Sequence, residues 1–436
     1  MKFKKIGSLL VATFLVLSFS ACSKTNPSPV SSKSSAPITL KLCFQGSASA
    51  ASQQQTVQIC NEFTKNNPNI TIKVLYIPVS SGWSEYFTKI QTMIAGGNAP
   101  DVSQIAIEGI QMFTSMGLAL PMDSYMKAHP DVVGDALTDI NPNLEKPFII
   151  GGKTYGLVAD WNNVVMHFNT KLLSDAGLSV PAETWTMQDY LNYCKALTKT
   201  VNGKKQFGTS IPNSYFQTEG ILYANGASIL NDDMTKCTLN SPQAVQIFQM
   251  YQDLVLKYKY APYPDPKVDS IQQLAIGQTA MGAWGRWPVA EYVQDNFKDV
   301  AIQLLPNFQS AGSNQKVVFG SGAICALKST SHPDEAIKFA IWTASQYFEK
   351  NYYGTGSIPT RKSVADEVIP QAGVPQNSDL FYKTASYATA VQAPSQYANI
   401  QTIFDKYMSE ILSSPVDVKT ELDKATDEIN NVLANQ

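Results

Sequence analysis

The chain has 436 residues, with 33 Lys and Arg against 35 Asp and Glu, so its formal net charge at pH 7 is -2. Because there is no basic excess to neutralise phosphates, nucleic acid is excluded as an expected partner. Only 16% of the residues are charged and 10% are aromatic, a composition that favours an exported protein that meets neutral solutes. About 400 residues beyond an export signal exceed what one hydrophobic core usually organises, which predicts two lobes. We expect the protein to be a monomer.

The N-terminal segment predicts export. Three of the first five residues are lysines, and an apolar run over residues 6–17 is too short for a stable membrane span. Residues 1–21 are therefore expected to be a signal peptide. The segment Ser18-Phe-Ser-Ala-Cys22 resembles a bacterial lipobox, which implies cleavage before Cys22, lipid attachment to it and anchoring at the outer face of the cell membrane. The alternative is an ordinary secretory signal in which Cys22 is incidental.

Residues 22–37 predict a tether, because Ser, Pro, Lys, Asn and Thr dominate there and cannot build a core. As a flexible chain the segment reaches roughly 20 Å, enough to keep a globular part beside a partner in the membrane.

Beyond the tether, strand and helix patterns alternate. Period-2 patterns predict strands over residues 38–44, 70–77 and 101–107, and helical periodicity predicts helices over 52–66, 83–95 and 109–116. This succession predicts an α/β fold with helices on both faces of a sheet and ligand groups at the carboxyl ends of strands.

Short motifs spread over the whole mature chain carry a resemblance to ABC-transporter extracellular solute-binding proteins, the family 1 sugar-binding group that includes maltodextrin-binding protein. The motifs are Phe63-Thr-Lys-Asn-Asn-Pro-Asn-Ile70, Gly96-Gly-Asn-Ala-Pro-Asp-Val102, Gly152-Lys-Thr-Tyr-Gly-Leu157, Phe168-Asn169, Ala176-Gly-Leu178, Thr184-Trp185, Leu239-Asn-Ser-Pro242, Gly277-Gln-Thr-Ala-Met281 and Ile358-Pro-Thr-Arg361.

The resemblance implies a two-lobed periplasmic-binding-protein-like fold with a hinge and a ligand cleft between the lobes. The expected N-terminal lobe is residues 38–160 with 323–350, and the C-terminal lobe is 161–322 with 351–436. Such a protein captures a solute by lobe closure and delivers it to an ABC permease, with no cofactor and no catalysis.

Residues 281–287 give the strongest site signal. Sugar hydroxyls need hydrogen-bonding side chains and sugar C–H faces pack on rings, so a sugar site combines Trp or Tyr with polar groups. The resemblance makes Trp287 the stacking ring. Trp284 and Arg286 stand where relatives often have other residues, so Trp284 either contacts ligand or packs within a lobe. Arg286 could hold a hydroxyl or the carboxylate of a uronic acid.

The remaining candidates come from the expected crossings between the lobes and from strand ends. Asp160, Trp161 and Asn162 lie at the first crossing, and an aromatic pair follows in which Tyr215 is expected to face the cleft and Phe216 the core. Glu108 either binds a hydroxyl or caps the helix after it, and Trp83 is either a cleft wall or a core anchor. The other candidates are Gln45 and Ser47 after the first strand, Ser321 in the second crossing at residues 320–322, Tyr353 by the third crossing, and Tyr397 as a far wall.

Several motifs predict architecture instead. Gly96 and Gly97 end a helix, Ser241 caps a helix that begins at Pro242, and residues 152–154 form a hairpin turn. For Arg361 a surface or inter-element ion pair is expected in preference to ligand contact. The cysteines beyond Cys22 are expected to be buried free thiols, although a bridge between Cys43 and Cys60 is conceivable, and the isolated histidines match no metal-ligand spacing.

Two alternatives from other classes stay open. An exported glycoside-processing enzyme would need two carboxylates about 5 to 9.5 Å apart, for which Asp160 and Glu108 are the candidates. A sensor module would present its ligand to a membrane receptor. The sequence does not identify the solute.

Overall fold

The computed structural model describes residues 36–79, 82–212, 214–265, 267–308, 316–354 and 356–434. The chain divides into two units, Met1–Ala36 and Pro37–Gln436, and the second unit is described here. The predicted signal peptide and the lipid on Cys22 lie outside the described residues. Within the described ranges, none of the helices combines the length and apolarity that crossing a bilayer requires.

The first three strands and the helices between them form as predicted, with bounds shifted by up to two residues. The elements are β1 (Ile38–Gln45), α1 (Ala50–Asn66), β2 (Ile70–Ile77), α2 (Trp83–Ala95), β3 (Val102–Ala106) and α3 (Ile107–Ser115). β1 is parallel to both β2 and β3. Helix α2 ends where the glycine pair predicts, because Gly97 takes a positive φ of 72° that other residues rarely adopt.

One large sheet, of order β13-β6-β12-β3-β1-β2 with β14 beside β12, connects distant parts of the chain. Its later strands are β6 (Val158–Asn163), β12 (Val318–Ala326), β13 (Ile358–Pro359) and β14 (Thr389–Ala390). β6 and β12 run antiparallel, and the predicted second crossing at residues 320–322 lies inside β12.

A three-stranded sheet of order β10-β7-β11 organises the other half of the unit. Its strands are β7 (Val165–Asn169), β10 (Met281–Trp284) and β11 (Val300–Gln303), and the small hairpins β4 (Ile149–Ile150) with β5 (Lys153–Thr154) and β8 (Lys199–Val201) with β9 (Lys204–Gln206) complete the strands of the described residues. The first hairpin confirms the predicted turn at residues 152–154.

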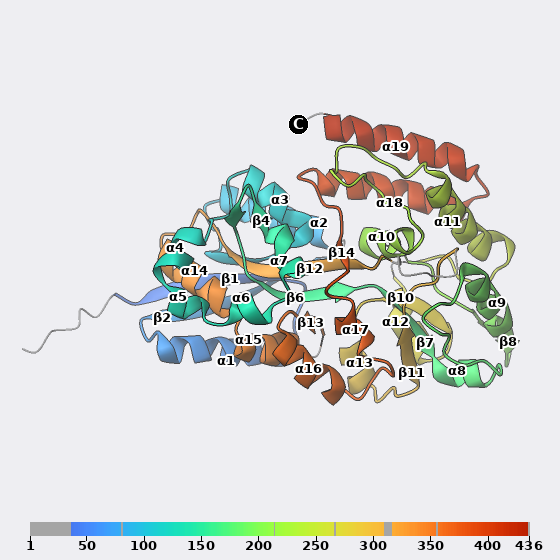
Figure 1. Ribbon diagram of the computed structural model, residues 1–436, viewed down its shortest axis with the longest axis horizontal. Helices are drawn as coiled ribbons and strands as arrows, with labels where there is room; N and C mark the ends of the chain where they lie inside the picture. The colour runs from blue at the N-terminus through green and yellow to red at the C-terminus, as the bar shows by residue number, and fades with distance from the viewer. Residues whose placement is uncertain are drawn as a thin grey trace, which may run out of the picture. The chain divides into compact units, whose positions relative to one another are not determined.

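Helices cover both sheets (Figure 1). They are α4 (Asp123–Ala128), α5 (Pro130–Val133), α6 (Ala136–Asp139), α7 (Pro142–Glu145), α8 (Thr170–Ser174), α9 (Met187–Leu197), α10 (Tyr215–Ala224), α11 (Pro242–Gln252), α12 (Ser270–Ala275), α13 (Val289–Gln294), α14 (Pro333–Trp342), α15 (Gln346–Phe348), α16 (Lys362–Gln371), α17 (Leu380–Lys383), α18 (Tyr397–Ser413) and α19 (Val418–Ala434). A π-helical segment, η3 (Glu349–Tyr353), precedes β13. The predicted cap is confirmed, since the Ser241 side chain accepts from the backbone of α11.

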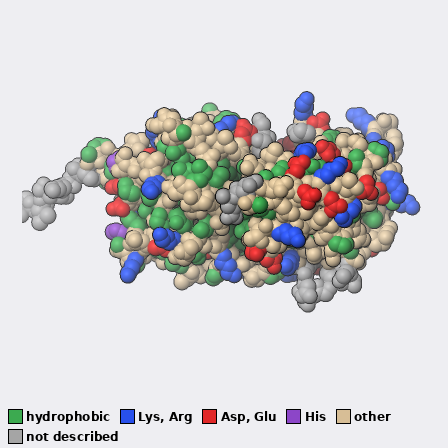
Figure 2. All heavy atoms as spheres, turned by 90° about the horizontal axis from the view of Figure 1, so that it is seen from above, with side chains coloured by type: hydrophobic (Ala, Val, Ile, Leu, Met, Phe, Trp, Pro, Cys, Tyr) green, Lys and Arg blue, Asp and Glu red, His purple; other side chains and the backbone are tan. Residues whose placement is uncertain are grey.

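The buried side chains form two separate hydrophobic cores. The first core, which includes Leu42, Phe63 and Phe339, packs α1, α2 and α14 against the large sheet and extends to Ile358 and Phe381. The second core packs α9, α10, α11, α18 and α19 against one side of the three-stranded sheet, while Val165, Trp284, Val300 and Ile302 of the same sheet belong to the first core. On the face shown in Figure 2, acidic and basic side chains are interspersed over the half that contains α18 and α19.

Candidate functional site

The site is built where β6 and β12 run side by side between the two cores. Gly322 pairs with Asp160 and Gly320 with Asn162. Because directly opposed residues share a face of a sheet, these four lie on one face and Trp161 and Ser321 on the other. Gly322 leaves room for the Asp160 side chain, since a Cβ at 322 would lie 2.7 Å from Asp160 Oδ1 and would require that carboxyl to shift.

Asp160 is the electrostatic centre of this face. Its Oδ1 is buried and has no hydrogen-bond partner. Burial raises the pKa of Asp160 to about 7, with a partial offset from a hydrogen bond to the Ser357 side chain. Burial also raises the pKa of Glu108, at the start of α3, to about 7, and the Asp160 carboxyl contributes to that rise. Both acids are therefore poised between the protonated and ionised forms near neutral pH.

Tyr353, at the end of η3, supplies a second orphaned polar atom. Its ring is 4% exposed and its hydroxyl has no hydrogen-bond partner. Burial raises its pKa well above the usual range, and Asp160 is the strongest of the charges that add to the effect. Since an unsatisfied buried polar atom costs about 1–3 kcal/mol, Asp160 Oδ1 and the Tyr353 hydroxyl each leave a hydrogen-bonding position open on this side of the sheet.

Aromatic rings from the second half of the unit face the same strands. Trp287 is half-buried, and its ring folds back over Gly285, where a Cβ would lie 2.4 Å from the ring. Phe216 lies 6.4 Å from Trp287 between ring centroids, and a Cβ on Gly320 would be 3.3 Å from the Phe216 ring. We call Glu108, Asp160, Phe216, Trp287 and Tyr353 the junction site.

The expected orientation of the aromatic pair was wrong. Tyr215 is fully buried in the second core, where its hydroxyl donates to the Gln392 carbonyl at 3.1 Å. Phe216 is the ring at the junction site. α10 begins at Tyr215 after the Ser214 cap and is buried on almost every side, so its residues carry no helical apolar pattern that reveals the exposed position.

Three other candidates have their side chains turned away from the junction site. Trp161 is fully buried, and its indole nitrogen donates to the Pro359 carbonyl. Ser321 shares its face with Trp161, and its hydroxyl is buried without a partner. Trp284 is 4% exposed and packs edge-on against His167 at 5.6 Å, in agreement with the packing alternative.

Arg286 contradicts the expectation of a free guanidinium in the cleft. It is 1% exposed. Its Nη1 donates to the Ser357 carbonyl at 2.5 Å and its Nη2 to the Gly354 carbonyl at 2.8 Å. Asn162 Oδ1 accepts from the Arg286 backbone amide at 2.8 Å, so both side chains are engaged in joining segments of the protein.

The N-terminal candidates lie around β1 and α2. Gln45 is partly buried and Ser47 is exposed just beyond the end of β1. Trp83 packs on the first core, stacked on Phe87 at 5.7 Å, which favours the anchor alternative.

The C-terminal candidate Tyr397 is 5% exposed and packs edge-on against Tyr215 at 5.1 Å. Burial raises the pKa of Tyr397, and Glu108 is the charged group that adds most to this rise.

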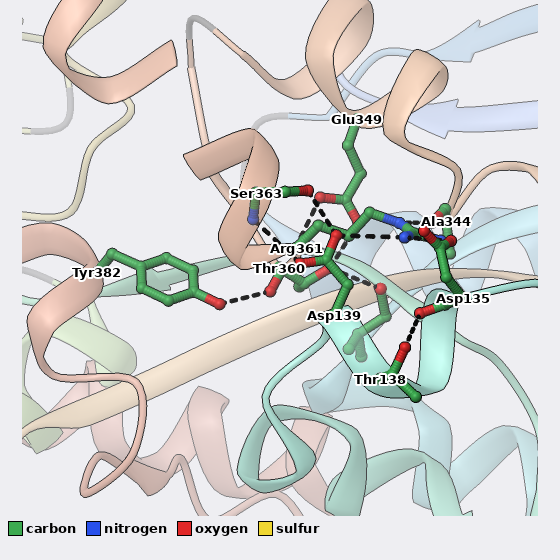
Figure 3. Close-up of polar contacts among 10 residues, drawn as sticks. Asp135, Thr138, Asp139, Ala344, Glu349, Thr360, Arg361, Ser363 and Tyr382 are labelled. Carbon is green, nitrogen blue, oxygen red and sulfur yellow. Dashed lines mark hydrogen bonds and ion pairs between the residues drawn. The ribbon is translucent and has the colours of Figure 1, made fainter. Parts of the chain in front are cut away.

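The motif Ile358-Pro-Thr-Arg361 serves the scaffold. Arg361 Nη1 pairs with Asp135 at 2.8 Å and with Asp139 at 3.3 Å, and Thr360 donates to the buried Glu349 at 2.6 Å. Figure 3 shows these groups converging from α6, η3 and the segment before α16. The predicted inter-element ion pair is confirmed, and Arg361 is itself only 3% exposed.

Tyr76 and Tyr352 form a further pair beside the junction site, which the sequence did not predict. The Tyr76 and Tyr352 hydroxyls are 3.3 Å apart, and both rings stack on Phe44, with centroids at 5.5 and 4.6 Å. Tyr76 is the seventh residue of an apolar strand, so only the strand's end position could have marked it.

Comparisons with known proteins agree with this architecture. A binding protein of Brucella abortus is 27% identical over 202 residues, which are 45% of this chain and 46% of that protein, so the match spans about half the length of this relative. The arabinooligosaccharide-binding protein of Bacillus subtilis is 22% identical over 374 residues, covering 73% of this chain and 79% of that protein.

Among solved structures, an ABC substrate-binding protein of Listeria monocytogenes in complex with cycloalternan superposes with a TM-score of 0.80. The sequence identity is 24%, and the match covers 92% of this chain and 100% of that chain. This likeness establishes the two-lobed, periplasmic-binding-protein-like fold. The model of the family described as bacterial extracellular solute-binding protein matches residues 58–380, and with that match over most of its length the chain belongs to this family.

Proposed function

We propose that the protein captures a neutral saccharide at the junction site and delivers it to an ABC permease. The observation that carries the proposal is the pairing of orphaned polar atoms with accessible rings. Asp160 Oδ1 and the Tyr353 hydroxyl are buried without partners, and the half-buried Phe216 ring, 6.4 Å from Trp287, faces Gly320 on the same side of the sheet as Asp160.

A sugar has the chemistry that such a site lacks. Its hydroxyls can donate to the Asp160 carboxylate and exchange a hydrogen bond with Tyr353, which removes the cost of leaving both unsatisfied. Its C–H face can pack on Trp287 or Phe216. The relatives named above, which bind an arabinooligosaccharide and cycloalternan, support the class of ligand.

The charges of the junction site support a neutral ligand over a sugar acid. The Arg286 side chain is 1% exposed, and its Nη1 and Nη2 already donate to the Ser357 and Gly354 carbonyls, which disfavours a direct ion pair with the carboxylate of a sugar acid. Asp160 and Glu108 present acidic groups instead, and a second carboxylate beside them is disfavoured by like-charge repulsion.

Capture would proceed by closure of the two lobes, residues 38–160 with 323–350 and residues 161–322 with 351–436. A solute that contacts both lobes binds the closed form better and shifts the equilibrium toward it. A hydrogen bond between cores supports a closed arrangement here: Ser84 Oγ on α2 donates to Gln401 Oε1 on α18 at 2.5 Å.

The permease would be reached from a lipid anchor on Cys22. The supporting observation is the lipobox-like segment followed by the polar tether of residues 22–37. Growth with a labelled fatty acid should label the wild-type protein and leave Cys22→Ala unlabelled. Equal labelling of the two would remove the anchor from the proposal.

Binding is tested by isothermal titration with maltotriose, arabinotriose, glucuronic acid and an amino acid mixture. We expect binding of a neutral oligosaccharide, and a loss of at least tenfold in affinity in Trp287→Ala. Trp342→Ala is the matched control, because Trp342 is also half-buried but packs on Phe339 in the first core. Binding confined to glucuronic acid or amino acids, or an equal loss in both variants, would refute the proposal.

A further inference from the structure

The two arginines of the sequence are used differently, although both are almost fully buried. Arg361 pairs with two aspartates. The guanidinium of Arg286, in the loop between β10 and α13, donates to two main-chain carbonyls. Burial lowers the pKa of Arg286 to about 10, so it remains charged at neutral pH. Among the described residues its guanidinium has carbonyls and no carboxylate as hydrogen-bond partners, and burying a charge without a counter-ion is costly.

The contacts of Arg286 join three segments that meet at the junction site. The guanidinium bridges the Gly354 and Ser357 carbonyls, which lie after η3 and before β13 respectively. The backbone amide is held by Asn162 on β6 at 2.8 Å. The residue therefore ties the loop after β10 to two segments of the large sheet.

Each of these attachment points adjoins a group of the junction site. Trp287 follows Arg286 directly, and Gly354 follows Tyr353. Ser357 is hydrogen-bonded through its side chain to Asp160, and its backbone amide donates to the Tyr353 carbonyl at 3.2 Å. The position of Arg286 thus sets how far the Trp287 ring lies from Asp160 and Tyr353.

We propose that Arg286 is a positioning residue for solute binding: it does not touch the solute, but fixes the spacing between Trp287 and the polar pair Asp160 and Tyr353. The inference rests on the proposed function of the junction site. A lysine cannot replace it fully, because its single nitrogen cannot reach two separate carbonyls with the planar fork of a guanidinium.

A double-mutant cycle separates positioning from general stability. Maltotriose affinity is measured by titration calorimetry for the wild type, Arg286→Met, Trp287→Ala and the double variant. We expect Arg286→Met to weaken binding at least tenfold in the wild-type background and less than twofold in the Trp287→Ala background, because its effect passes through the ring. Equal losses in the two backgrounds would overturn the proposal.

Arg361→Met is the matched control, since it removes the other buried guanidinium. We expect it to lower the melting temperature and to leave maltotriose affinity within twofold. Arg286→Lys should recover part of the affinity and serves as the second variant if Arg286→Met does not fold. An affinity loss in Arg361→Met as large as that in Arg286→Met would count against a specific role.

A measurement on the ligand-free protein tests the role of Arg286 independently of whether the protein binds maltotriose. Hydrogen exchange at the Ser357 amide should be at least tenfold faster in Arg286→Lys than in the wild type, because the turn is released. If the wild type does not bind maltotriose, the proposed function fails for that sugar, while the exchange rates still decide the role of Arg286. An unchanged Ser357 rate would overturn it.

Discussion

Replacing Tyr353 by Phe tests whether the site has a missing partner, because it deletes only the orphaned hydroxyl. Without ligand, the stability of the wild-type protein is reduced by burying a hydroxyl that has no hydrogen bond. Its removal should raise the free energy of unfolding by about 1 kcal/mol, within the 1–3 kcal/mol range for such groups. Binding should change in the opposite direction, with a loss of about 2- to 10-fold in saccharide affinity, equivalent to one neutral hydrogen bond.

Two matched variants give this experiment its controls. The Tyr86 hydroxyl is equally buried, but contacts the Cys43 carbonyl at 2.9 Å and Ser103 Oγ at 2.8 Å, so Tyr86→Phe should lower the free energy of unfolding by about 1–3 kcal/mol. Ser321→Ala removes an orphaned hydroxyl on the opposite face of the sheet and should stabilise the protein without changing affinity.

Stability is measured by urea unfolding monitored by circular dichroism, and affinity by titration calorimetry. Variants are compared only if the free energy of unfolding depends on urea concentration with the same slope as in the wild type. If Tyr353→Phe destabilises the protein as much as Tyr86→Phe does, the Tyr353 hydroxyl has a partner and the reasoning is refuted. If affinity is unchanged, Tyr353 lies outside the solute site.

Three further predictions follow from buried charged groups and thiols. Because burial raises the pKa of Asp160 in the folded protein from its ordinary value of 3.8 to about 7, the contribution of Asp160 to the free energy of unfolding is greatest below about pH 4 and is lost as pH rises through 7. Between pH 4 and 8, the free energy of unfolding measured in urea should therefore fall by about 2–4 kcal/mol less in Asp160→Asn than in the wild type. An equal fall in the two proteins would contradict the raised pKa of Asp160. Burial raises the pKa of Cys43 and Cys60 to about 12, and a thiol reagent at pH 8 should reach the five cysteines beyond Cys22 only after unfolding; rapid reaction of the native protein would disprove their burial. Arg361→Met should cost about 1.5–3 kcal/mol of unfolding free energy, since it removes a buried guanidinium that is hydrogen-bonded to the half-buried Asp139, and a loss below 1 kcal/mol in the same urea assay would show the pair to be solvated.

Much of the fold was predictable because its signals are local. The end of α2 at a glycine pair and the start of α11 at Ser241 depend on backbone conformation and on caps within a few residues. The expected binding protein, as opposed to an enzyme, is confirmed by the family to which the chain belongs. The lobe boundaries stay predictions.

The site was predictable only in part, because side-chain direction depends on pairing between distant strands. Asp160, Trp161 and Asn162 looked equivalent in sequence, and the register of β6 against β12 assigns the first and third to one face and Trp161 to the other. The partners of Arg286 could not be foreseen at all. They are main-chain carbonyls 68 and 71 residues later in the chain, and since every residue has a backbone carbonyl, the residue types there do not indicate this contact.

The burial of every cysteine in the described part of the chain makes the protein suited to site-specific labelling. Cys43, Cys60, Cys194, Cys237 and Cys325 are all free and buried, so a cysteine introduced at an exposed position would be modified selectively. Ser47 is such a position, just past the carboxyl end of β1. A dye attached to Ser47→Cys would then turn the chain into an optical sensor, in which fluorescence reports solute concentration while the five buried cysteines of the described residues are left in place.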